Sequence, residues 1–248
     1  VIEKVKQNFT SEYKKPIKNS FPKEKILTSQ ARKTAYADTQ TGYMLIGFRG
    51  TEVDNKDSYA LDVLATILGD GRSSVFYRTI KEQKQLATSI SASNAGFRDD
   101  GIFYISATFI PDKCSKLEQT IFDEIKNIQK NGVNQEQLTL AQNIIERDTY
   151  YARESISNIA GELGYTYVTT DDTKYYETYI ENIKKVTVSD VKRVAQKYLG
   201  TEKSAVSILL PNSSKEVKIS NITAQNLPAK LINENTNTQK YKLSNGAT

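Results

Sequence analysis

Residues 60–93, ALDVLATILGDGRSSVFYRTIKEQKQLATSISAS, contain the change of hydrophobic period that decides the fold. Four apolar residues recur at i, i+3, i+4 and i+7: Leu61, Leu64, Ala65 and Leu68. This spacing predicts a helix over residues 55–68 with one core-facing stripe. The glycines in Gly69-Asp70-Gly71 end it, and Ser73 or Ser74 can cap a second helix over residues 75–84.

On both sides of this segment the pattern becomes that of strands. Residues 86–97 and 101–109 are β-type runs separated by a turn that contains Gly101, which predicts an antiparallel hairpin. Upstream, residues 34–38 and 42–50 are aromatic-rich runs joined by a short turn. We expect them to form two neighbouring strands, with residues 43–49 at the centre of the sheet.

Most of the chain after residue 112 has a helical period. One helix is predicted to end at Asn131-Gly132, and Asn134 to cap a long helix over 135–167 in which Gly161 and Gly164 favour a kink. Three further elements follow: helices over 173–184 and over 189–199, the latter opened by Ser189 and closed by Gly200, and a strand over 204–211.

This order of elements predicts an α+β fold, an antiparallel or mixed β-sheet with helices packed on one face. Strict alternation of strand and helix is missing. The sequence therefore argues against a doubly wound parallel sheet and against the nucleotide crevice that such a sheet provides.

The composition excludes several kinds of chemistry. The chain has no histidine, so it cannot supply a Ser-His-Asp triad, a Cys-His dyad or a histidine zinc site. Cys114 is the single cysteine, which rules out an internal disulfide. The net charge of +5 includes no basic stripe, so we expect no nucleic-acid partner, and no apolar run approaches the ~20 residues of a membrane span.

Several segments of the sequence resemble those of a known protein family. LGDGRSS (68–74) and KEQKQLATSISAS (81–93) are similar, in order and spacing, to a helix-to-strand segment of M16 metallopeptidases, the insulinase, pitrilysin and mitochondrial processing peptidase family. Residues 122–148 resemble that family's pair of helices, and residues 186–200 its penultimate helix. The resemblance covers about residues 30–210 and implies the LuxS/MPP-like metallohydrolase type of α+β fold, in the form of the inactive, C-terminal type of M16 domain.

The resemblance also implies a domain organisation. Residues 1–9 are expected to end a helix of a preceding domain, because Val1, Val5 and Phe9 share one helical face. The polar stretches 10–30 and 212–238 are expected to be linkers that flank the M16-like domain, 31–211. Residues 239–248 resemble the first strand of a following M16 unit, so the chain is expected to be part of a larger protein.

M16 proteases use a zinc ion held by two histidines and a glutamate, with a second glutamate as general base. None of these residues can be placed on a chain without histidine, so zinc is expected in an N-terminal domain outside this sequence. The family also holds substrate with an Arg and a Tyr seven residues apart. Lys81 and Thr88 occupy those positions, where Lys81 lacks the guanidinium fork and Thr88 the reach of a phenol, so this substrate-binding pair is degenerate.

The resemblance therefore implies a non-catalytic domain of an M16-type zinc metallopeptidase, with no metal or catalytic residue of its own. It would form a chamber wall, pack against the zinc-bearing domain and contact a peptide substrate. Two alternatives stay open: a structural or assembly subunit of M16 fold without peptidase activity, and a substrate-binding partner subunit of a heterodimeric M16 protease. The occupants of positions 81 and 88 argue against the second alternative.

Other conspicuous residues have plain structural interpretations. The glycines and serines at 69–74 are interpreted as a helix break and cap rather than a phosphate loop, because the Gly-Lys-Ser/Thr ending is missing. The pairs Asp99-Asp100 and Asp171-Asp172 are interpreted as solvated turns. Seven tyrosines are interpreted as helix-packing aromatics with solvated hydroxyls: Tyr150, Tyr151, Tyr165, Tyr167, Tyr175, Tyr176 and Tyr179.

Overall fold

The computed structural model describes residues 1–9, 27–215, 229–235 and 238–243 of the 248-residue chain. Within residues 27–215, five strands form one sheet in the order β1-β5-β2-β4-β3. Their bounds are β1 Ala31–Ala37, β2 Gly42–Arg49, β3 Ser89–Gly96, β4 Gly101–Phe109 and β5 Ser204–Pro211. β1 pairs with β5 in parallel and the other pairs are antiparallel, so the sheet is mixed, as predicted.

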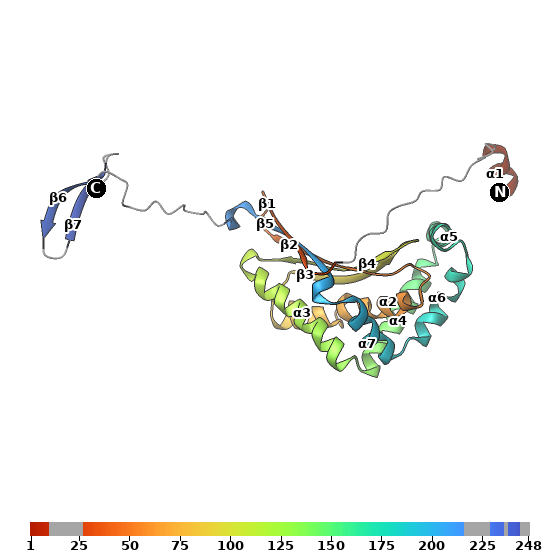
Figure 1. Ribbon diagram of the computed structural model, residues 1–248. Coiled ribbons are helices and arrows are strands. Elements are labelled where there is room, and N and C mark those ends of the chain that lie inside the picture. The colour runs from red at the N-terminus through yellow and green to blue at the C-terminus, as the bar shows by residue number, and fades with distance from the viewer. Residues whose placement is uncertain (10–26, 216–228, 236–237, 244–248) are drawn as a thin grey trace.

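The helices are α2 Lys56–Gly69, α3 Cys114–Asn131, α4 Gln135–Ala152, α5 Ile156–Thr170, α6 Lys174–Lys185 and α7 Val188–Tyr198. A π-helical segment, η1 (Tyr77–Gln83), continues a helical turn begun at residue 75. Figure 1 shows α2, α3, α4 and α7 on one side of the sheet and no helix across the other side. The predicted α+β class with helices on one face is therefore confirmed. No helix in the described part of the chain is long and apolar enough to cross a membrane.

The sheet buries every second residue of its central strand on the side that the helices cover. Met44, Ile46 and Phe48 on β2 are buried, whereas Tyr43 and Leu45 between them are exposed. This alternation places β2 third of five strands and confirms the predicted central position of residues 43–49. Only a glycine fits at Gly69, where a Cβ atom would lie 2.0 Å from the backbone nitrogen of Ala92.

The prediction that residues 34–38 and 42–50 form neighbouring strands is wrong. β5 lies between β1 and β2 and pairs with both. The physical reason is burial: β5 places Val206 and Ile208 in the core, whereas almost every residue of β1 is exposed. An apolar strand gains more from a central position, and a polar one costs less at an edge.

Two helix boundaries also differ from the prediction. The long helix over 135–167 breaks after Ala152, and the side chain of Ser155 accepts a hydrogen bond from the Asn158 amide to begin α5. The helix does not break at Gly161 or Gly164, where a kink was expected, because both glycines lie within α5. Helix α7 begins with a capping box between Thr187 and Asp190, so the predicted opening residue Ser189 lies inside the helix.

The described residues outside 27–215 form one helix and two strands. Helix α1 (Ile2–Asn8) has no buried residue, and strands β6 (Ala229–Asn235) and β7 (Thr238–Leu243) form an antiparallel pair. β6 therefore lies within the predicted linker 212–238 and β7 overlaps the predicted strand 239–248. Residues 10–26, 216–228, 236–237 and 244–248, which belong to the predicted linkers and final strand, lie outside the described residues.

Helices α2 and α7 are joined by a polar cluster on Asp57. The Asp57 carboxylate accepts hydrogen bonds from Arg193 (2.7 Å), Lys197 (2.8 Å) and the Tyr198 hydroxyl (2.8 Å). Burial alone would raise the pKa of Asp57, but the hydrogen bonds from these three residues lower the pKa to about 2. Asp57 is therefore ionised at neutral pH, and its hydrogen bonds join α7 to the first turn of α2.

Candidate functional site

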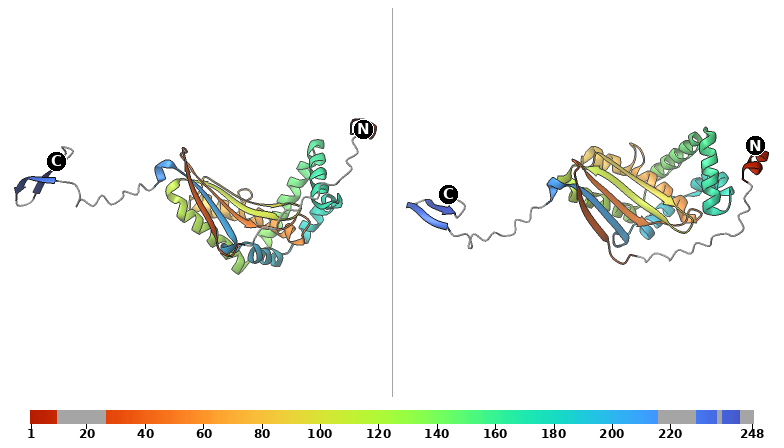
Figure 2. Two further views of the ribbon diagram at one scale, coloured as in Figure 1. Left: turned by 45° about the horizontal axis from the view of Figure 1, so that its top comes forward. Right: turned by 90° about the horizontal axis from the view of Figure 1, so that it is seen from above.

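The side of the sheet that carries no helices leaves strand side chains available for binding. We call it the open face and define it by the outward side chains of three strands: Tyr43, Leu45, Arg49, Ile102, Tyr104, Ser106, Thr108, Ala205, Ser207 and Leu209. The strand registers place these side chains next to one another, with Tyr43 opposite Thr108 and Leu209, and Leu45 opposite Ser106 and Ser207. Figure 2 shows the five strands from this side.

The open face combines large apolar side chains with hydroxyl groups. Tyr43, Leu45 and Ile102 are large apolar residues that remain exposed on it. Toward the β3 edge the hydroxyls of Ser91 and Ser106 are hydrogen-bonded at 2.9 Å. Such a surface can bind another polypeptide through apolar contacts and hydroxyl groups.

One end of the open face carries an ion pair. Arg49 on β2 donates two hydrogen bonds to the Asp100 carboxylate in the β3–β4 turn, at 3.1 and 2.5 Å. Asp171 similarly pairs with Arg98, and Asp172 accepts a hydrogen bond from the Lys174 amide. Asp100, Asp171 and Asp172 thus accept hydrogen bonds from groups of the protein itself.

The two substrate-binding positions implied by the resemblance lie next to the edge strand β3. The Lys81 ammonium lies 5.0 Å from the centre of the Tyr77 ring on η1. Thr88 precedes β3, and both its amide and its hydroxyl donate to the Thr108 carbonyl. In the described structure no hydrogen bond or ring contact joins Lys81 to Thr88, and each side chain is engaged with its own neighbour.

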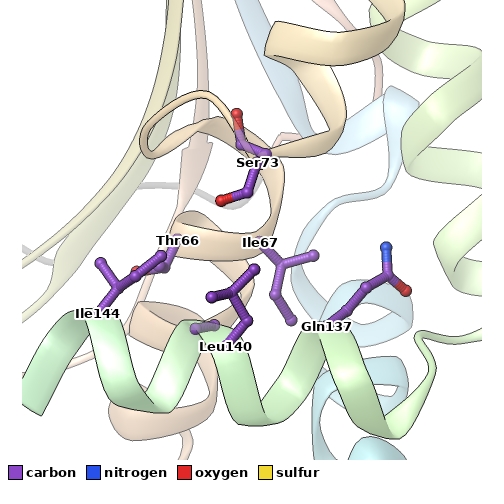
Figure 3. A pocket seen from close by; sticks show the side chains of 8 residues that line it. Thr66, Ile67, Ser73, Gln137, Leu140 and Ile144 are labelled. Carbon is purple, nitrogen blue, oxygen red and sulfur yellow. The ribbon is translucent and has the colours of Figure 1, made fainter.

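The glycine-serine turn has the structure predicted for it. The Ser74 hydroxyl accepts a hydrogen bond from the Tyr77 amide at 3.4 Å and donates to the Gly71 carbonyl at 2.8 Å. It therefore works as a helix cap. A shallow hollow beside it, between α2 and α4, has room for little more than one water molecule. Figure 3 shows its lining, including Thr66, Ile67, Leu140 and Ile144, on the helical side of the molecule rather than on the open face.

A cluster that was not predicted from the sequence lies where α2, α6 and β3 meet. The Asp62 carboxylate accepts hydrogen bonds from Asn94 (2.8 Å) and from the Tyr179 hydroxyl (2.9 Å). Burial raises the pKa of Asp62 to about 6, although these two hydrogen bonds act to lower the pKa. The Asn94 side-chain oxygen is buried without a hydrogen-bond partner. A carboxylate within an otherwise apolar helix segment was the only signal of this cluster in the sequence.

The seven tyrosines divide into two groups. Tyr175 and Tyr179 pack with Tyr59 at ring-centre distances of 5.7 to 5.9 Å, and Tyr176 lies under the Arg153 guanidinium. These three pack as predicted. The other four differ, because their side chains are largely exposed on α4 and α5: Tyr150, Tyr151, Tyr165 and Tyr167.

The chain does not fit a zinc site. It contains no histidine, and in the described residues no three cysteine, aspartate or glutamate side chains come together to hold a metal. Burial raises the pKa of Cys114, so its thiol is protonated at neutral pH and is a poor nucleophile. The open face can therefore bind and position a polypeptide, while none of the described groups is arranged for nucleophilic or metal-assisted hydrolysis.

A mixed five-stranded sheet with helices on one face and an uncovered opposite face defines the α+β class of this domain. A family model described as peptidase M16 inactive domain matches residues 1–145. The chain thus belongs to the M16 zinc protease family, as one of its inactive domains.

Individual relatives agree with this assignment. The zinc protease PqqE of Helicobacter pylori is 27% identical over 170 residues, which is 68% of this chain and 38% of that protein. An uncharacterised zinc protease of Streptomyces coelicolor is 24% identical over 178 residues, 72% of this chain and 39% of the relative. The chain thus spans about two fifths of the length of these relatives.

Solved structures show the same fold. The crystal structure of a protease from Helicobacter pylori matches with a TM-score of 0.77 and 25% identity, over 84% of this chain and 51% of that chain. A peptidase M16 inactive domain from Pseudomonas fluorescens matches with a TM-score of 0.72 and 18% identity, over 80% of this chain and 47% of that chain.

Proposed function

We propose that this chain is the non-catalytic domain of an M16 zinc metallopeptidase in which its open face forms one wall of the substrate chamber. The zinc ion and the hydrolytic groups belong to another domain of the same protein. In this arrangement the chain contributes surface and shape: it contacts the peptide, positions it and helps to exclude water from the reaction.

The observation that carries the proposal is the uncovered face of the sheet. Large apolar side chains on a solvent-exposed sheet face are costly unless a partner covers them or a substrate uses them. Tyr43 and Leu45 lie in the first half of β2, opposite the hydroxyl-bearing residues Thr108 and Ser106, whose hydroxyls can form hydrogen bonds with a peptide. Lys81 and Thr88 are proposed as weak peptide contacts at the β3 margin, because both side chains are already engaged with protein groups.

The proposal includes the domain limits. Residues 31–211 would be the M16 domain, and 10–30 and 212–238 the connections to the units on either side. The presence of β6 within the second connection adds a β6–β7 hairpin to that plan.

The test is a charge placed on the open face of the zinc-bearing protein that contains this chain. Leu45→Asp puts a carboxylate where an apolar contact is proposed, so kcat/KM for a quenched fluorescent peptide library is expected to fall about tenfold, a loss of ~1.4 kcal/mol. Zinc content, measured by mass spectrometry of the metal, should stay unchanged, because the ion is held elsewhere.

A matched control is available on the helical side. Leu140 on α4 has nearly the same exposure as Leu45, 43% against 44%, and does not belong to the open face. Leu140→Asp is expected to leave kcat/KM unchanged. Equal activity of the Leu45→Asp and wild-type proteins would contradict the chamber-wall role, and a zinc-bearing protein that cleaves no peptide at all would favour the scaffold alternative.

A further inference from the structure

Helix α5 is unusual among the helices of this domain because its apolar residues are not buried. Its 15 residues contain one charged residue, Glu162, and one buried residue, Thr166. Ile156, Tyr167 and Val168 are exposed by 85%, 58% and 65%. A contiguous exposed apolar surface of this kind is typical of a protein interface rather than of an ordinary solvated helix.

The centre of the exposed side of α5 is formed by small residues. At 100° per residue, Ser157, Gly161, Gly164 and Val168 follow one line along the helix, on the side away from Thr166. A Cβ atom built on Gly161 or Gly164 would meet nothing in the described structure within 4 Å. Glycine weakens a helix, so two glycines with no neighbour in this domain are explained if another backbone approaches closely there.

The helix is nevertheless held firmly in place. The Tyr165 hydroxyl donates a hydrogen bond to the Gly96 carbonyl at the end of β3. Arg98 donates to the Val168 carbonyl at 3.0 Å and forms an ion pair with Asp171 at the end of α5. Figures 1 and 2 show α5 beyond one end of the sheet, next to α6. Polar contacts thus present the apolar surface in a fixed position without covering it.

The most direct candidate to cover this surface is the rest of the protein. The relatives matched by this chain extend well beyond it, because the chain covers only 38 to 44% of each of the first four. A lipid surface fits poorly, since helices that lie on membranes carry basic residues beside their apolar face and α5 contains only Glu162. An uncharged protein surface matches a helix that offers no charge of its own on its exposed side.

We propose that the exposed side of α5, defined by Ile156, Gly161, Gly164, Tyr167 and Val168, is the docking surface for an apolar helix of the zinc-bearing M16 unit of the same protein. This inference rests on the proposed function and deepens it. It assigns the packing contact between the two units to α5, and leaves the open face to the substrate.

The test is site-specific photo-crosslinking in the full protein. A benzophenone amino acid is placed at position 168, with Lys126 on the exposed side of α3 as the control position, and the cross-linked peptides are identified by mass spectrometry. Position 168 is expected to cross-link to peptides of the zinc-bearing unit of the same polypeptide, and position 126 is not. Links only to residues 1–248, to a second copy in an isotope-mixed sample, or to lipid would each overturn the proposal.

Two glycine variants separate docking from folding. Gly164→Phe fills the proposed contact and is expected to reduce the cross-link yield from position 168 at least tenfold, while Gly164→Ala, which adds only a methyl group, is expected to reduce the yield by less. The Tm of the 248-residue chain, measured for both variants, shows whether either one perturbs the fold, and Gly164→Ala should not lower it, because a Cβ atom there meets nothing within 4 Å in the described structure. Equal cross-link yields in the two variants would overturn the close approach at this glycine.

Failure of the docking through α5 can be distinguished from failure of the chamber-wall role of the open face. Cross-links from position 168 together with unchanged peptide cleavage by the Leu45→Asp protein would support docking and remove the chamber wall. Reduced cleavage by Leu45→Asp without cross-links to the zinc-bearing unit would support the chamber wall and remove the docking through α5.

Discussion

Asp62 is a carboxyl group whose charge state depends on the fold. It lies in the middle of α2 and is partly buried between Asn94 and Tyr179. Its pKa of about 6 exceeds the ordinary value of 3.8, because burial penalises the ionised form more than the two hydrogen bonds favour it. Between pH 4 and 6 the folded protein therefore holds a proton that the unfolded chain releases.

This difference predicts a stability that falls as the pH rises from about 4 to about 6 and levels off above that range. By linkage, the raised pKa costs the folded state up to about 3 kcal/mol at pH 7 and almost nothing at pH 4. Asp62→Asn removes the charge, and the introduced amide can donate to the unpartnered Asn94 oxygen. We expect the variant to be more stable than wild type by about 1–2 kcal/mol at pH 7 and nearly equal to it at pH 4, in urea unfolding monitored by circular dichroism.

Asp57→Asn provides the control for that experiment. The pKa of Asp57 is about 2, so this carboxylate stays ionised at both pH values. Its loss is expected to destabilise the protein by a similar amount at pH 4 and at pH 7, since three donors lose a charged acceptor. A pH-independent effect of Asp62→Asn would contradict the raised pKa.

At the scale of elements, alanine substitutions of glycines in α2 and in α5 are expected to have opposite effects on stability. Gly161→Ala and Gly164→Ala place a methyl group in open space within a helix, so each is expected to stabilise the isolated chain by about 0.5–1 kcal/mol. Gly69→Ala forces a methyl group against the Ala92 backbone, and is expected to cost about 2–4 kcal/mol. Denaturant midpoints measure all three, and a loss of stability in Gly161→Ala would show an unrecognised contact of α5.

Local signals in the sequence predicted most of these elements. The strand order was predicted wrongly because strand pairing depends on residues that lie far apart in the chain. The stripe on residues 61–68 and the capping residue Asn134 identify their helices because they act within a few residues. The sequence contains no equivalent local signal that β5, over 160 residues after β1, pairs beside it. The break before Ser155 was also missed, because a serine cap is a weak signal within a region of helical period.

The candidate site was less predictable than the fold. The alternation along β2 indicated that Tyr43 and Leu45 share a face, but which face the helices cover is decided by packing of the whole domain. The exposure of α5 was equally hidden, because its apolar composition is that of a buried helix. A helix that depends on a partner cannot be distinguished by its own residues from one that is covered within its domain.

At the scale of the whole molecule, the absence of histidine gives a direct prediction. The purified 248-residue chain is expected to retain less than about 0.1 zinc per molecule after dialysis, since imidazole is the usual ligand of catalytic zinc. It should also leave a peptide library uncleaved. Stoichiometric zinc, or cleavage that a chelator abolishes, would contradict the assignment of the chemistry to another domain.

The insertion of β5 between β1 and β2 has a consequence for synthesis on the ribosome. Residues 204–211 supply the strand that joins β1 to the rest of the sheet, so the first strand has no partner until nearly the whole domain has been translated. Long-range pairing of this kind slows folding. Nascent chains arrested before residue 204 should therefore remain sensitive to protease at β1, and those extended far enough to clear the exit tunnel past residue 211 should become protected.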